Sequence, residues 1–255
     1  MSEVPAARHA LRLIMYLAGH SGPVRASTAS RDLGLPRSTV YHLLNVMREE
    51  GFLLHSPENQ AWLLGPLVSD IGSSVLRSNA LGQLARPILE RLVAETRLPI
   101  VAHLGVLQHA DVVYASKIAA PGAPAVVTSI GVRLPAHLTA TGRAMLADVP
   151  LDQLRASYPL GQTLPTRSGP GPVTTDELDG VLAATRERGW AIEDGDITPE
   201  YGSVAAAVHD RNRYPTAAIG LTFRGSTVDE RQWRQLGRAT KNAAEALGQR
   251  IRGRS

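Results

Sequence analysis

A group of polar and aromatic side chains between residues 36 and 45 could contact DNA. An arginine can donate two hydrogen bonds to guanine or to a phosphate, and histidine and asparagine can bond to base edges or to the DNA backbone. Serine and threonine at the start of a helix stand beside backbone amides that favour a phosphate. The candidate DNA-binding residues are Pro36, Arg37, Ser38, Thr39, Tyr41, His42 and Asn45.

Apolar residues in the same segment predict that a helix carries this group. They recur at i, i+3, i+4 and i+7 and form one buried stripe: Val40, Leu43, Leu44 and Met47. Pro36 suits the first helical turn, because its missing N–H would have no partner there, and Gly51 ends the helix. A polar helix face also occurs on any solvated helix, so the neighbouring elements decide between the two interpretations.

The neighbouring elements favour a DNA-binding unit. Helical periodicity extends over residues 6–20, and a short helix over 28–33 is closed by Gly34. After the third helix, apolar runs at 52–55 and 61–64 flank a turn at 56–60, which is a strand–turn–strand pattern. Three short helices followed by a hairpin predict a winged helix-turn-helix domain over residues 1–66.

The rest of the chain predicts a second, α+β domain. Residues 67–81 indicate a linker helix, and residues 82–255 mix helices and strands without a repeat. The expected helices span 82–96, 139–147, 175–188 and 228–251, and residues 161–172 are predicted to form a surface loop. The expected strands span 100–107, 111–116, 125–128, a segment near 191, 204–209 and 217–223.

Composition excludes several classes of protein. The 255 residues contain no cysteine, which rules out disulfides, thiolate nucleophiles and cysteine metal sites. No apolar run approaches the roughly 18 residues of a membrane span and no cleavable signal pattern opens the chain, so a cytoplasmic protein is expected. The net charge is +4, but residues 1–66 carry only +1 of it. Local geometry, rather than bulk charge, must therefore locate a DNA site.

Two other function classes compete with DNA binding. An enzyme is disfavoured because the chain lacks the common nucleophile, zinc-protease and phosphate-loop motifs. Pairs such as His103 and Asp111 are not accompanied by a nucleophile at the spacing of a known catalytic motif. The acidic run Glu193–Asp196 lacks the spacing of a calcium loop, so neither a metal nor a cofactor is expected. A ligand-sensing adaptor without DNA binding is disfavoured by the polar third helix.

Residues 29–44, with Gly51 and Leu64-Gly65 after them, resemble the winged helix-turn-helix of the IclR family of transcriptional regulators. The segment 131–147, GVRLPAHLTATGRAMLA, resembles its most diagnostic stretch, and 188–191 and 217–222 resemble two later landmarks. The resemblance covers nearly the whole chain in the expected order.

This resemblance implies a GAF-like effector-binding and oligomerisation domain over 82–255, a dimer or tetramer, and repression through operator DNA that a small metabolite modulates. Organic or aromatic acids are the effector class that the resemblance implies. A neutral or hydroxylated compound stays open if Glu193 points inward. The implied ligand-binding residues are Val126, Leu134, His137, Ala140, Thr141, Glu193, Ser203, Gly220 and Thr222.

The chain departs from the family pattern at three positions. His42 stands where many relatives have arginine, Arg143 where many have lysine, and Ser203 near a position that is cysteine in some members. Arg133 and His137 could each pair with a ligand carboxylate, or could be a surface ion pair and a structural histidine. The operator sequence and the ligand do not follow from the resemblance.

Overall fold

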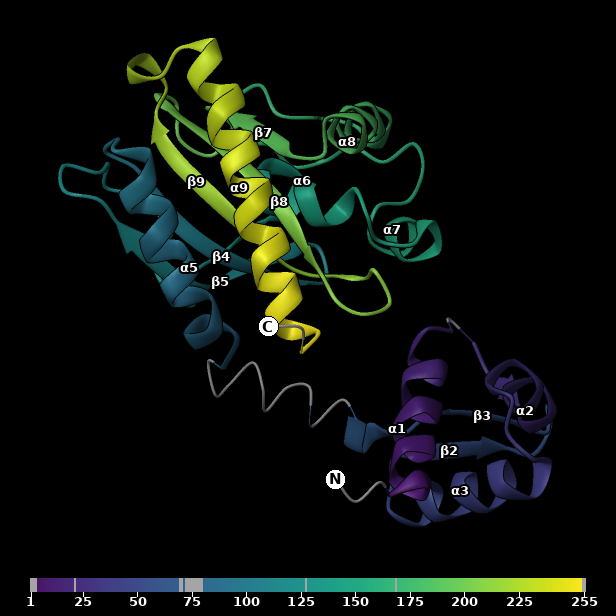
Figure 1. Ribbon diagram of the computed structural model, residues 1–255. Helices are drawn as coiled ribbons and strands as arrows, with labels where there is room; N and C mark the ends of the chain where they lie inside the picture. The colour runs from purple at the N-terminus through teal and green to yellow at the C-terminus, as the bar shows by residue number, and fades with distance from the viewer. Residues whose placement is uncertain are drawn as a thin grey trace. The chain divides into compact units, whose positions relative to one another are not determined.

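The computed structural model describes residues 4–20, 22–68, 71, 80–126, 128–167 and 169–253. The chain divides into two compact units, Met1–Ser78 and Asn79–Ser255 (Figure 1). The predicted boundaries at 66 and 81 lie near this division, and the predicted linker helix falls mostly outside the described residues.

The N-terminal unit has three helices and a small antiparallel sheet. In chain order its elements are α1 (Pro5–Ala18), β1 (Val24–Arg25), α2 (Ala26–Leu33), α3 (Arg37–Glu49), β2 (Leu53–Ser56) and β3 (Ala61–Leu64). The strands lie in the order β1-β3-β2, so the predicted hairpin gains the short strand β1 at its edge. Apolar residues of all three helices form one core with Leu53 and Trp62 of the hairpin.

The turn between α2 and α3 fixes the direction of α3. Gly34 ends α2 in the left-handed conformation with φ of 66°, which glycine adopts without steric cost. Leu35 is buried, and its carbonyl accepts a hydrogen bond from Ser30 Oγ at 2.7 Å. Pro36 caps α3 from outside instead of occupying the predicted first turn, because its ψ of 139° is extended and Arg37 is the first helical residue.

The C-terminal unit is built on a six-stranded antiparallel sheet. Its strands are β4 (Val101–Gln108), β5 (Asp111–Ala119), β6 (Arg133–Pro135), β7 (Ala191–Asp194), β8 (Tyr201–His209) and β9 (Pro215–Arg224), in the order β6-β5-β4-β9-β8-β7. The helices are α5 (Ala80–Thr96), α6 (Ala140–Leu146), α7 (Leu151–Ser157), α8 (Thr175–Arg188) and α9 (Glu230–Ile251), with short 3₁₀ turns η1 (Ala136–Leu138) and η2 (Gly225–Thr227).

Helices cover both faces of this sheet (Figure 1). Alternate residues of β4, β8 and β9 pack with α5 and α9 into one apolar cluster. Strand residues that point to the other face of the sheet pack with α6, α7 and α8 into a second cluster. The second face carries small side chains such as Ala205 and Ala218, which let the short helix α6 approach the strands closely.

Most of the predicted elements are present, and the α+β class is confirmed. The predicted strand at 125–128 is wrong in the described residues 125, 126 and 128, which lie in a loop. The strand β6 and the helix α7 were not predicted, because each is short and α7 begins directly after Pro150. No helix in the described ranges is long and apolar enough to cross a membrane.

Candidate functional site

The polar face of α3 is available to a partner. Arg37, Ser38, Tyr41, His42 and Asn45 are exposed, and Thr39 is half-buried. Within the described parts of the chain, no hydrogen bond or ion pair ties any of these six side chains to another residue. Tyr41 keeps 51% of its surface exposed although it is a large aromatic residue. The stripe Val40, Leu44 and Met47 is buried on the opposite side, as predicted, and Leu43 is half-buried.

The N-terminal end of α3 adds free backbone donors. The first intrahelical hydrogen bond runs from the Val40 amide to the Pro36 carbonyl at 3.0 Å. Pro36 has no side-chain oxygen to cap the helix, so no side chain accepts from the first turn. The amides of residues 37–39 therefore point out of the helix end, where a phosphate is favoured by both the N–H groups and the helix dipole.

The C-terminal unit has a small cavity, partly open to solvent, on the α6 side of the sheet. The free space inside it is only about 30 Å³, which indicates a compact ligand. The residues that line it are His103, Tyr114, Val126, Thr128, Leu134, Thr139, Ala140, Glu193, Ile197, Thr198, Tyr201, Ser203 and Thr222.

Six of the nine predicted ligand-binding residues line this cavity. They are Val126, Leu134, Ala140, Glu193, Ser203 and Thr222. Two of the other three, Thr141 and Gly220, lie behind the lining. The Thr141 hydroxyl is 3.2 Å from the hydroxyl of Tyr114, and a Cβ on Gly220 would come within 2.6 Å of His103 Nε2. These two residues therefore support side chains that line the cavity.

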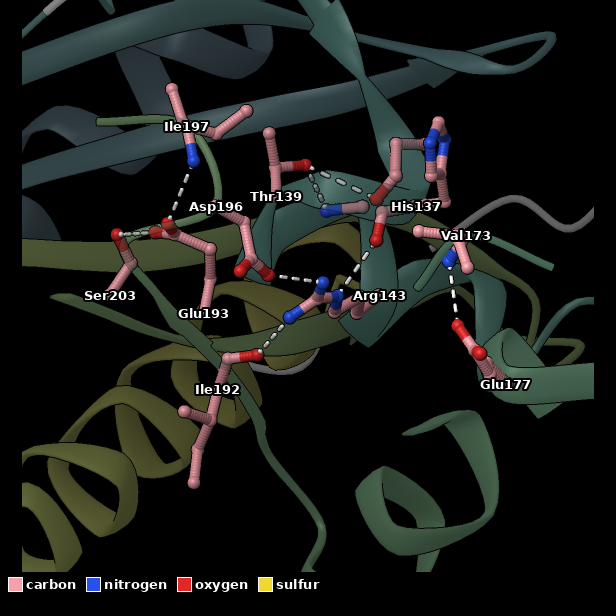
Figure 2. A network of polar contacts seen from close by, with 12 residues as sticks. His137, Thr139, Arg143, Val173, Glu177, Ile192, Glu193, Asp196, Ile197 and Ser203 are labelled. Carbon is pink, nitrogen blue, oxygen red and sulfur yellow. Dashed lines mark hydrogen bonds and ion pairs between the residues drawn. The ribbon is translucent and has the colours of Figure 1, made fainter. Parts of the chain in front are cut away.

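His137 lies outside the lining. Its Nε2 is 2.8 Å from the Pro165 carbonyl, and its ring packs edge-on against Tyr158. Burial lowers the pKa of His137, which makes the neutral ring that donates to this carbonyl the favoured form. In Figure 2 the ring points away from Glu193 and Ser203. Arg133 is exposed and contacts Asp111 and Gln108, so it behaves as a surface residue.

Glu193 is the acidic group of the cavity. It is 3% exposed, and its two oxygens accept hydrogen bonds from Ser203 Oγ at 2.8 Å and from the Ile197 amide at 3.1 Å (Figure 2). Ser203 Oγ is also 3.0 Å from Thr222 Oγ1. Burial raises the pKa of Glu193 to about 6, although these hydrogen bonds oppose the rise.

Arg143 holds the loop that follows β7. Its guanidinium donates to the carbonyls of His137 and Ile192 and forms an ion pair of 2.5 Å with Asp196 (Figure 2). Both side chains of this pair are 6% exposed. Because Arg143 comes from α6 and Asp196 from the loop after β7, the pair joins the two elements beside the cavity. A lysine here would supply one charge but not these three separate donor directions.

The acidic run 193–196 does not form a metal site in the described residues. Glu193 is bonded to Ser203 and Ile197, and Asp196 to Arg143. No group of three potential ligands comes together in the parts of the chain that the structure describes.

Seven lining residues were not predicted: His103, Tyr114, Thr128, Thr139, Ile197, Thr198 and Tyr201. His103 was available as a signal, because it is a histidine inside the apolar run of β4. Tyr114 comes near Glu193 only through the sheet order β5-β4-β9-β8-β7, which the sequence pattern does not specify, and Thr128 lies in a loop without a regular pattern.

Comparison with known proteins shows the family. Residues 6–57 match the IclR helix-turn-helix domain, and residues 73–249 match the Bacterial transcriptional regulator IclR C-terminal domain. The chain is 26% identical to the acetate operon repressor of Salmonella typhimurium, over 96% of this chain and 89% of that protein.

Solved structures show the same fold. The Agobacterium tumefaciens repressor BlcR is 29% identical with a TM-score of 0.57, over 98% of each chain. An IclR homolog from Microbacterium hydrocarbonoxydans, complexed with 4-hydroxybenzoate, is 21% identical with a TM-score of 0.61, over 97% of this chain and 99% of that one. The two domain matches cover most of the chain, and their family consists of regulators, so the prediction of a non-enzyme is confirmed. The protein is a member of the IclR family of bacterial transcriptional regulators.

Proposed function

We propose that the protein is a repressor that binds operator DNA through α3 and changes that binding when a small molecule occupies the cavity of the C-terminal unit. The observation that carries the proposal is the free polar face of α3, with uncapped amides at its N-terminal end. In a helix-turn-helix domain, this end of the second helix approaches the base edges of the major groove.

The similar proteins support repression in particular. The acetate operon regulator and BlcR are both named as repressors, and the Microbacterium homolog holds a small molecule. A bacterial DNA-binding regulator acts in the cytoplasm, where the chromosome lies. A dimer is part of the proposal, because two copies of α3 would read two half-sites about one helical turn apart.

DNA selection tests the first half of this function. Full-length protein is incubated with a pool of random duplexes, and bound duplexes are sequenced after several rounds. We expect one enriched motif with two-fold symmetry. Recovery of no preferred sequence would contradict operator reading, and an asymmetric single half-site would contradict the dimer.

Filling the cavity tests the second half. Compounds from a panel of small acids, alcohols and sugars are screened for release of the protein from the selected DNA. Ala140→Phe should abolish the response to any active compound, because Ala140 lines the cavity and is 2% exposed. The control Ala119→Phe changes an exposed position at the end of β5 and should leave the response intact. An unchanged response in Ala140→Phe would place the effector elsewhere.

A further inference from the structure

The cavity contains an acid and many neutral polar groups, but no strong base. Within the described part of the chain its lining includes no lysine or arginine. Burial lowers the pKa of His103 to about 3, so its ring is neutral near pH 7. Val126, Leu134, Ala140 and Ile197 supply apolar walls. A ligand carboxylate would therefore meet a buried glutamate without a cation to neutralise it.

Arg143 and Lys117 act electrostatically on the lining residues Glu193 and His103, but neither offers a free charge to a ligand in the cavity. Arg143 donates to Asp196 and to the carbonyls of His137 and Ile192. Lys117 is paired with His103 across β4 and β5, and its charge acts on His103 by lowering the pKa of that ring further. Neither side chain lines the cavity.

Among the described residues, two lining side chains have buried polar atoms that no other described residue hydrogen-bonds. They are His103 Nδ1 and Thr128 Oγ1, in residues that are 2% and 6% exposed. Nearly all buried polar atoms in folded proteins are hydrogen-bonded, so such atoms in a cavity call for a ligand or water. A hydroxyl group can both donate and accept, and it can therefore pair with a threonine hydroxyl or with either nitrogen of a neutral histidine.

Glu193 supplies acceptor capacity at the other side. Each of its oxygens accepts one hydrogen bond from the protein, from Ile197 N and from Ser203 Oγ. An ionised carboxylate has about four acceptor positions, so two remain for ligand donors. Two charged groups lie around Glu193: Asp196 in the following loop and Arg143 in α6. The other titratable groups near it are Tyr114 of β5, His103 of β4 and Tyr201 of β8.

We propose that this cavity binds a small uncharged compound with at least two hydroxyl groups, such as a short polyol, and excludes carboxylates. One hydroxyl donates to Glu193, and another satisfies His103 or Thr128. This inference rests on the proposed function, because it names the chemical class of the effector of the same site.

Calorimetry with matched pairs of compounds tests the proposal. Full-length protein at pH 8 is titrated with glycerol and glycerate, threitol and threonate, and glucose and gluconate, together with 4-hydroxybenzyl alcohol and 4-hydroxybenzoate. We expect at least one neutral member to bind, and its acid to bind at least tenfold more weakly. Tighter binding of an acid, or binding by none of the neutral members, would overturn the proposal.

Glu193→Gln identifies the source of the discrimination. The variant keeps the side-chain shape and removes the charge, so the preference for the neutral member over its acid should fall about tenfold at pH 8. Glu177→Gln is the matched control, because Glu177 also accepts a backbone amide, that of Val173 at 2.7 Å, but lies outside the lining (Figure 2). It should leave the preference unchanged. An unchanged preference in Glu193→Gln would contradict the assigned role of the glutamate.

Failure of the ligand class can be distinguished from failure of the regulator function. If an acid binds, Ala140→Phe abolishes its binding, and the acid releases the protein from selected DNA, the cavity remains the effector site and only the proposed class is wrong. If the protein selects no DNA sequence, the regulator function fails whatever the cavity binds.

Discussion

At the scale of single residues, buried charge dominates the C-terminal unit. Arg143 and Asp196 are both nearly inaccessible and are joined at 2.5 Å, and Glu193 is buried three residues before Asp196 in the chain. A buried charge that loses its partner is costly, whereas an exposed ion pair contributes little. These residues should therefore respond to substitution much more strongly than the arginines on the surface.

Arg143→Met should lower the free energy of unfolding by about 3–5 kcal/mol, because it leaves Asp196 buried without a counter-charge. Arg155→Met is the matched control: its ion pair with Asp179 spans 2.6 Å, but both side chains are about one third exposed. It should cost about 1 kcal/mol or less. Urea denaturation measures both, and equal losses would show that the burial of the pair is not decisive.

Glu193 predicts a pH-dependent stability. Its pKa is raised to about 6, so the folded state binds this proton more tightly than the unfolded chain and stability is lost as the pH rises from about 4.5 to about 6. Glu193→Gln removes that loss. The free energy of unfolding of the variant, minus that of the wild type, should be roughly 2 kcal/mol higher at pH 8 than at pH 4.5. Denaturation curves at both pH values test this, and a pH-independent difference would contradict the raised pKa.

Residue types predicted part of the cavity and missed part. Small and apolar positions in the diagnostic segment, such as Leu134 and Ala140, were placed at the cavity by resemblance. His137 was expected to face a ligand because its type suits a carboxylate, but its ring nitrogen donates a hydrogen bond to the Pro165 carbonyl, 28 residues away. A contact at that separation depends on the path of the loop, which carries no regular pattern.

At the scale of elements, the helix-turn-helix was readable from sequence because local signals agree. The apolar stripe of α3, the glycine at the turn and the hairpin all point to the same arrangement. The short strands β1 and β6 were missed, because two or three residues show no periodicity. They form through pairing with β3 and β5, which is a property of the folded unit.

The close packing of α6 against η1 predicts opposite effects of the same substitution in two helices. A Cβ on Gly142 would collide with the backbone of Ala136, whereas Gly180 in α8 has no neighbouring atom within 4 Å. Gly142→Ala should destabilise the unit by about 1–3 kcal/mol through overpacking. Gly180→Ala should stabilise it by about 0.5–1 kcal/mol, because alanine favours helix. Thermal unfolding of both variants tests the difference, and the same sign for both would contradict the packing.

At the scale of the whole molecule, net charge is a weak guide to the DNA site. Residues 1–66 carry six arginines against five acidic residues, so the DNA-binding unit is nearly balanced. Specific contacts from α3, repeated in a dimer, would have to provide recognition. The assembly and the domain boundaries remain predictions, because they depend on contacts between parts or copies of the chain.

Balanced charge predicts a modest salt dependence. Each protomer is expected to neutralise on the order of three phosphates, so a dimer should give a slope of roughly −5 in log affinity against log salt concentration. Fluorescence anisotropy with selected DNA between 50 and 300 mM salt, on the order of the physiological range, measures it. A slope near −10 or steeper would require a basic surface that α3 does not provide.

The most direct test compares Arg37→Ala with Arg48→Ala on selected and unrelated DNA. Both arginines are exposed on α3, but only Arg37 lies at its N-terminal end. For each protein, the affinity for selected DNA is divided by the affinity for unrelated DNA. Contacts to phosphates contribute to both affinities and cancel in this ratio. Arg37→Ala should lower this ratio by about 10- to 100-fold, equivalent to roughly 1–3 kcal/mol, and Arg48→Ala should leave it unchanged. An unchanged ratio in Arg37→Ala would contradict the assignment of α3 as the element that reads DNA.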